Sequence, residues 1–319
     1  MFPKSYLKEL ESGNYSSKVV RDPVAGIKMT HEGFASPVQD TFFDIEKRVK
    51  EMEASGLDMQ VISLANPWLD VFEGEKAVKM ARQMNSEISK IVETHRGRFV
   101  GLASLPFDDI DVTLEELDVA VRDFGLKGVT MGTTIKGEAI DSPRFKPFFD
   151  KLNRTGLPLF IHPVRPPNFP FKLDQEYFLI PMITFPYQTT LCATRLVFNG
   201  VMKEFPKLKI VLSHLGGTLP YLAGRIDAAS ENSPVLKQRL GRLPSTFFKE
   251  FYYDTISFYK PSLMCGYDLA GADRMLFGTD YPFTIGTPRS LAQSINQLGI
   301  PAEEKRKILS ENARKLLKL

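Results

Sequence analysis

The chain has 319 residues, of which 43% are hydrophobic and 25% are charged, a balance typical of a globular protein with a large core. Its 41 basic and 38 acidic residues are mixed along the whole length, so we expect neither nucleic acid nor a membrane surface as a partner. The longest apolar runs are far shorter than the roughly 20 residues of a membrane span. Two cysteines without CxxC spacing suit a reducing compartment, and we therefore expect a cytoplasmic protein.

The first 42 residues differ in pattern from the rest of the chain. They begin with the helix-like segment SYLKELESG and continue with a polar stretch that contains Pro23, Gly26, Gly33 and Pro37. Such a stretch lacks the apolar runs of a buried element. We interpret residues 1–42 as a lid-like excursion over the mouth of the domain.

From about residue 43, helical patterns alternate with short apolar runs. The first helical pattern places Ile45, Val49 and Met52 on one face and ends at Gly56, a common helix stop. Further helices are predicted over Gly74 to Thr94, Val112 to Phe124, Pro147 to Thr155, Pro186 to Phe205, Leu263 to Ala270, and from Pro301 onward. Strands are predicted at 58–64, 99–105, 127–131, 158–162, 209–213, 251–254 and 275–278.

This alternation predicts an α/β protein with a parallel sheet, because parallel strands need helical crossovers. Seven strands separated by helices favour a TIM (β/α)8-type barrel without its first strand. Since no linker or low-complexity segment interrupts the rhythm, we expect a single domain over residues 1–319.

Three polar residues follow apolar runs at the carboxyl ends of predicted strands: His162 in PLFIHP, His214 in KIVLSH and Asp280 in MLFGTD. Ligands of α/β barrels bind at this end of the strands, so barrel geometry would converge the three side chains. Imidazole and carboxylate ligands suit Zn²⁺ or a similar divalent metal. One metal and one His not bound to it would divide Lewis-acid and proton-transfer work.

Each of these residues also has an ordinary structural explanation, since a lone His at a strand end is usually a core or loop residue. Three further residues are candidates for substrate binding. Arg165 directly follows His162 and would pair with a carboxylate, although a solvated loop cation explains it equally well. His31 lies in the lid-like excursion. Trp68 follows a predicted strand and is either a packing residue or part of a pocket wall.

Longer segments resemble the amidohydrolase-related decarboxylase family, which includes aminocarboxymuconate semialdehyde decarboxylases. The resemblance runs almost end to end through FVGLASLP, FIHP, NGVMKEFPKLKIVLSHLGG, LPYLAGRID, FGTDYPF and ENARKLL. It implies that His162 is a metal ligand, that His214 is the acid/base residue, and that Asp280 is a ligand that also moves protons. It further implies a homodimer in which Arg225 of one subunit reaches toward the other.

The activity implied is metal-dependent removal of CO₂ from a small unsaturated or aromatic carboxylic acid, with Zn²⁺ or Mn²⁺ as the cofactor. Hydrolysis of a lactone or amide on the same scaffold is the alternative within enzymes. A metal-free barrel that binds a small acid or a partner without turnover is the alternative outside them.

One family feature is missing from this sequence. The family begins with a strand ending in H-x-H, followed by a segment much like MFPKSYLKEL, and here Met1 stands directly after the expected second His. We therefore expect a barrel without its first strand and an enzyme impaired by the lack of two ligands. A start codon assigned too late, a true loss of the strand and a deliberate truncation are the open explanations.

Overall fold

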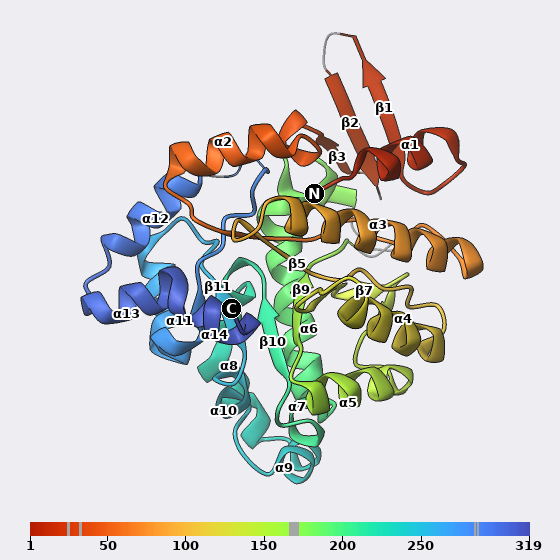
Figure 1. The fold of residues 1–319 in the computed structure, drawn as a ribbon. Helices are drawn as coiled ribbons and strands as arrows, with labels where there is room; N and C mark the ends of the chain where they lie inside the picture. The colour runs from red at the N-terminus through yellow and green to blue at the C-terminus, as the bar shows by residue number, and fades with distance from the viewer. Residues whose placement is uncertain (24–25, 32–33, 166–171, 284, 286) are drawn as a thin grey trace. The chain divides into compact units, whose positions relative to one another are not determined.

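A computed structural model describes residues 1–23, 26–31, 34–165, 172–283, 285 and 287–319 of the chain (Figure 1). The chain forms two compact units. Unit 1 comprises Met1–Thr130, Ile135–Gly137 and Val164–Ile180, and unit 2 comprises Met131–Thr134, Glu138–Pro163 and Pro181–Leu319. Because short segments alternate between the units, the division does not follow a linker in the sequence, and a single domain over residues 1–319 stays a prediction.

Unit 1 contains an antiparallel sheet, helices and two parallel strands. Its elements are α1 (Lys4–Ser12), β1 (Lys18–Asp22), β2 (Gly26–His31), β3 (Phe34–Pro37), η1 (Asp40–Phe42), α2 (Ile45–Ser55), β4 (Gln60–Ile62), α3 (Gly74–Thr94), β5 (Phe99–Gly101), α4 (Ile110–Arg122) and η3 (Lys172–Gln175). The predicted helix at Gly74 to Thr94 is confirmed. The helix predicted before Gly56 is confirmed as α2, which the Asp44 side chain caps at its start and Gly56, at φ 72°, closes.

The polar stretch after α1 forms the three-stranded sheet β1-β2-β3, with Val19 opposite Met29 and Met29 opposite Ser36. Sequence patterns did not predict these strands. Most of their side chains are exposed, and Met29 is the one buried residue among those described in β1 and β2. A sheet with so little buried surface carries no continuous apolar run.

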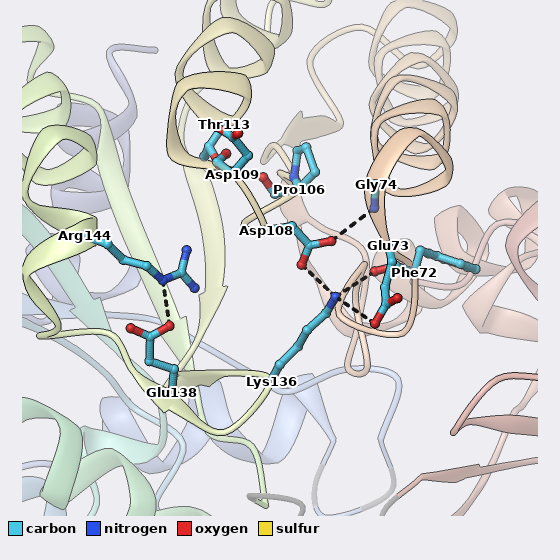
Figure 2. A network of polar contacts seen from close by, with 10 residues as sticks. All are labelled: Phe72, Glu73, Gly74, Pro106, Asp108, Asp109, Thr113, Lys136, Glu138 and Arg144. Carbon is cyan, nitrogen blue, oxygen red and sulfur yellow. Dashed lines mark hydrogen bonds and ion pairs between the residues drawn. The ribbon is translucent and has the colours of Figure 1, made fainter.

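A polar network joins three loops of unit 1, as Figure 2 shows. The Lys136 ammonium lies 2.6 Å from the Asp108 carboxylate and donates a 3.1 Å hydrogen bond to the Phe72 carbonyl oxygen. The other Asp108 oxygen accepts from the backbone N–H of Gly74, the first residue of α3, at 3.3 Å. The loops that follow β4 and β5 are therefore tied to the turn that carries Lys136.

Unit 2 alternates strands and helices. Its elements are β8 (Glu138–Ala139), η2 (Pro143–Phe145), α5 (Lys146–Thr155), β9 (Pro158–His162), α6 (Phe185–Phe198), α7 (Val201–Glu204), β10 (Lys209–Leu212), η5 (His214–Gly216), α8 (Leu219–Glu231), α9 (Pro234–Leu240), α10 (Pro244–Phe248), β11 (Tyr252–Asp254), α11 (Lys260–Ala270), η6 (Ala272–Arg274), β12 (Met275–Leu276), α12 (Pro288–Asn296), α13 (Ala302–Arg306), η7 (Lys307–Glu311) and α14 (Asn312–Leu317). Three elements, β6 (Val129–Gly132), β7 (Thr134–Ile135) and η4 (Ile180–Thr184), have residues in both units.

One long helix predicted in unit 2 is wrong. The pattern from Pro186 to Phe205 forms two helices, because α6 ends at Phe198 and Gly200 has a φ of 84°, outside the helical range. α7 then begins at Val201 and runs only to Glu204. The apolar periodicity continues through the break, so it did not reveal the turn.

All seven predicted strands are present, each at or inside its predicted range to within one residue. β4 is parallel to β5 in unit 1. The larger sheet has the order β12-β11-β10-β9-β6, in which β9, β10, β11 and β12 are parallel neighbours. The chain is therefore an α/β protein with a parallel sheet. Leu316 of α14 packs on Val211 and Leu276, which anchors the closing helix to β10 and β12. No helix in the described part of the chain has both the length and the apolar character that crossing a membrane requires.

Candidate metal centre

Unit 2 brings His162, His214 and Asp280 together. One possible ligand atom from each side chain lies within 4.8 Å of the others, and the two imidazole rings are 5.1 Å apart at an angle of 74°. β9 ends at His162, while His214 and Asp280 lie in the loops that follow β10 and β12. Because these strands are parallel members of one sheet, their carboxyl ends meet at the same edge.

His162 is held as a neutral imidazole. Its Nδ1 lies 2.9 Å from the carbonyl oxygen of Pro163, a geometry that assigns the ring proton to Nδ1 and makes Nε2 the lone-pair nitrogen. Burial, aided by the nearby His214 charge, lowers the pKa of His162 to about 4. A neutral imidazole with an oriented lone pair is the form that binds a metal.

His214 has the opposite electrostatic setting. Burial by itself lowers its pKa, but the carboxylates of Asp280 and Asp254 outweigh burial and raise the pKa above its usual value. The Asp280 Oδ2 lies 3.8 Å from Nε2 of His214, close enough for an ion pair. His214 is therefore suited to hold and release a proton, whereas His162 is suited to bind a cation.

The backbone at two of these three residues is unusual. His214 and Asp280 have φ values of 56° and 54°, in the left-handed region that residues other than glycine rarely adopt. Leu215, Gly216 and Gly217 continue this conformation after His214. Such strain concentrates at functional sites, where the surrounding structure imposes it.

Two residues that sequence reasoning did not single out contact this centre. The ring of Phe185, at the start of α6, lies 5.7 Å from the His162 ring and stacks parallel to the His214 ring at 6.5 Å. Asp254, the last residue of β11, accepts hydrogen bonds from the backbone of His214 and Leu215. Asp254 is also a polar residue at the end of a predicted strand, in the segment FYYDT. The criterion that singled out His162 and His214 would therefore have identified it.

The four other sequence candidates belong to two different units. Arg225 is exposed on α8 of unit 2. Arg165, Trp68 and His31 belong to unit 1. Arg165 forms a buried bidentate pair with Asp174 at 2.9 and 3.0 Å, so its guanidinium already faces a carboxylate.

Within unit 1, Trp68 is buried and His31 is half-buried. The Trp68 carbonyl oxygen accepts a hydrogen bond from the Tyr6 hydroxyl. His31 Nδ1 lies 2.6 Å from the Ser17 hydroxyl, and burial lowers the His31 pKa to about 4. Substrate contact by either residue stays a prediction.

The donor set of the centre fits a divalent cation. Imidazole nitrogen and carboxylate oxygen are ligand types that Zn²⁺ and Mn²⁺ accept. The Nδ1 atom of His214 is buried without a hydrogen-bond partner in the described structure, as in a site that awaits a further polar group. His162 and Asp280 would hold the ion, with His214 beside it.

Comparison with known proteins gives consistent similarities. Residues 35–319 match the model of the amidohydrolase family. A 2-amino-3-carboxymuconate-6-semialdehyde decarboxylase of Dictyostelium discoideum is 27% identical, over 100% of this chain and 90% of that protein. A gamma-resorcylate decarboxylase of Rhizobium sp. (strain MTP-10005) is 30% identical, over 88% of this chain and 90% of that protein.

A solved structure extends the similarity to three dimensions. The dihydroxybenzoic acid decarboxylase of Polaromonas sp. JS666, with bound manganese and the inhibitor 2-nitroresorcinol, superposes with a TM-score of 0.80 at 27% identity. The match covers 88% of each chain.

Proposed function

The chain belongs to the amidohydrolase family, and we propose that it is a metal-dependent decarboxylase that removes CO₂, without oxidation, from a small aromatic or unsaturated carboxylic acid. The observation that carries this proposal is the convergence of His162, His214 and Asp280 at the carboxyl edge of one parallel sheet. The substrates named for its relatives, gamma-resorcylate and dihydroxybenzoate, support an aromatic acid.

His162, through Nε2, and Asp280, through a carboxylate oxygen, would hold the metal, which would supply Lewis-acid chemistry at the substrate. Mn²⁺, present in the Polaromonas structure, and Zn²⁺, which imidazole and carboxylate ligands also suit, are both proposed cofactors. Phe185 forms an apolar wall beside both imidazoles and excludes water from them.

His214 supplies the proton. As an imidazolium beside Asp280, it donates the proton to the substrate carbon that bears the carboxylate. The bond from that carbon to the carboxylate then breaks, its electron pair returns to the ring or double bond, and CO₂ leaves. The products are the protonated organic fragment and CO₂, and solvent returns a proton to His214.

Several finer features complete the proposal. We propose a TIM-type barrel, which the chain-ordered parallel strands support, and a lid role for residues 1–42. Arg165, Trp68, His31 and Arg225 are proposed substrate contacts. A cytoplasmic location is supported by Cys192 and Cys265, which are both free thiols.

A homodimer is also proposed. Its support is a set of exposed apolar side chains in unit 2 that we name the α6–α8 surface: Met182, Ile183, Tyr187, Leu191 and Tyr221. The helices α6 and α8 pack on each other, and Arg225 lies one turn after Tyr221 on α8. Exposed apolar patches commonly mark protein interfaces.

The test is a substrate screen of the purified protein with added Mn²⁺ or Zn²⁺. Dihydroxybenzoates and related acids are followed by CO₂ release, and lactones are followed by acid formation. We expect CO₂ release from an aromatic acid, with its loss in H162A and in D280N together with loss of bound metal. Acid formation without CO₂ would identify a hydrolase instead, and bound acid without turnover would identify a binding protein.

A further inference from the structure

We propose that Asp254 is a positioning residue for His214, because its carboxylate holds the backbone that presents the imidazole to the site. The inference rests on the proposed function, in which His214 moves the proton. Asp254 itself touches neither His162 nor Asp280 through any described hydrogen bond, so it acts through His214.

The Asp254 carboxylate gathers three backbone N–H donors. Its Oδ2 accepts from His214 at 2.9 Å, and its Oδ1 accepts from Leu215 at 2.9 Å and from Ile256 at 3.0 Å. The side chain is buried, which strengthens each of these charge-assisted bonds relative to its strength in water. One carboxylate therefore links the end of β11 to the loop after β10.

The loop that it holds is strained and enclosed. His214 and Leu215 both adopt left-handed φ values of 56°. A Cβ on Gly216 would lie 2.6 Å from the Tyr253 ring, and a Cβ on Gly217 would lie 2.0 Å from the Pro186 carbonyl oxygen. Packing leaves the loop little room, and Asp254 satisfies the two amides at its strained positions.

The imidazole of His214 depends on this backbone for its orientation. A histidine at a functional site is usually oriented by a hydrogen bond on the ring nitrogen that faces away from the chemistry. His162 has such a bond to Pro163, whereas Nδ1 of His214 has no hydrogen-bond partner among the described residues. The orientation of the His214 ring therefore depends on the conformation of its main chain. Asp254 is the group that fixes this conformation.

The main test compares D254N with a matched control, D227N. Asn keeps the size of the side chain but has only one acceptor oxygen. Its NH₂ group is itself a donor and cannot accept a hydrogen bond from a backbone N–H. We expect kcat to fall roughly 100-fold with KM changed less than about threefold, since a misplaced proton donor affects the chemical step. Asp227 also accepts a backbone N–H in unit 2, from Ser245 at 2.8 Å, and D227N should stay within about twofold of the original activity.

A double variant separates positioning from a merely structural role. If Asp254 acts through His214, D254N in an H214Q background should reduce kcat by less than about threefold further. A full additional 100-fold loss would show an independent role and overturn the proposal, as would a D254N enzyme with unchanged kcat. Should D254N fail to fold, D254E, which keeps the charge and displaces the carboxylate, should show the same loss of kcat.

Amide hydrogen exchange tests the proposal without any activity. In D254N the amides of His214 and Leu215 should exchange at least about tenfold faster than in the original protein, while the Ser245 amide is unchanged. Equal protection in both proteins would overturn the positioning role. An original protein that releases no CO₂ but shows this exchange difference would refute the decarboxylase function and leave the inference about Asp254 standing.

Discussion

At the scale of single residues, the charged partners of two buried histidines give them opposite protonation behaviour. His162 and His214 are both buried at one sheet edge, yet the pKa of His162 falls to about 4 and that of His214 rises. The difference comes from the Asp280 carboxylate near Nε2 of His214 and from Asp254 behind its backbone. One imidazole is therefore prepared to bind a cation and the other to carry a proton.

His31 allows a residue-scale prediction of pH dependence. Its pKa is about 4 in the folded chain and about 6.5 in the unfolded chain, so below pH 6.5 the unfolded chain binds a proton that the folded chain does not. Stability from the neutral ring is complete above pH 6.5 and is lost as pH falls toward 4. His162 acts in the same direction, and His214, with a raised pKa, acts in the opposite one.

Between pH 7 and pH 5, the His31 contribution should lower the unfolding free energy of the original protein by about 2 kcal/mol. The interval below the unfolded-state pKa is about 1.5 pH units, and each unit is worth about 1.4 kcal/mol. H31Q should lack this decrease. Gln retains a group that can hydrogen-bond the Ser17 hydroxyl. Urea unfolding of both proteins at the two pH values measures the difference. An identical pH dependence would show that His31 titrates normally in the folded chain.

At the scale of elements, the loop from His214 to Gly217 shows how packing constrains a functional segment. We expect G217A to destabilise the protein by more than about 2 kcal/mol, because Gly217 has a φ of 67° and its Cβ would meet backbone oxygen. G224A, in the middle of α8 with open space around the added Cβ, should be neutral or stabilise by up to about 1 kcal/mol. Urea unfolding checks both, and equal effects would contradict the constraint.

The pair of Arg165 and Asp174 gives a second prediction at this scale. Their side chains are only 6% and 9% exposed, so R165M would leave a buried carboxylate and should cost about 3–5 kcal/mol. The control R154A breaks the pair between Arg154 and Asp150, whose side chains are 67% and 46% exposed. It should cost less than about 1 kcal/mol. A similar small cost for both variants in urea unfolding would leave Arg165 available as a substrate ligand.

At the scale of the whole molecule, the α6–α8 surface predicts self-association. Light scattering should give twice the 36.0 kDa mass of the chain, and Y221E should give a monomer because Tyr221 is 81% exposed and a buried glutamate is costly. The control V20E changes an exposed apolar residue of β1 in unit 1 and should remain a dimer. A monomer at micromolar concentration for the original protein would contradict the proposed interface.

Local patterns in the chain were sufficient for the parallel strands, most of the helices and the three polar residues that the structure brings together. The reason is that burial of a parallel strand on both faces demands an apolar run, so His162, His214 and Asp280 stand out where such runs end. The helix at Gly74 to Thr94 likewise follows from a periodicity that 21 residues make unambiguous.

Other features depend on contacts between distant segments and could not be predicted from local patterns. The exposed strands β1 to β3 and the break at Gly200 leave no apolar signature, since they depend on pairing and on a single φ angle. Asp254 and His214 are 40 residues apart, and the Phe185 ring reaches both histidines from a third segment. A pattern along the chain reports which side chains are buried, whereas the contacts that orient an imidazole and set its pKa arise between segments and exist only in the folded protein.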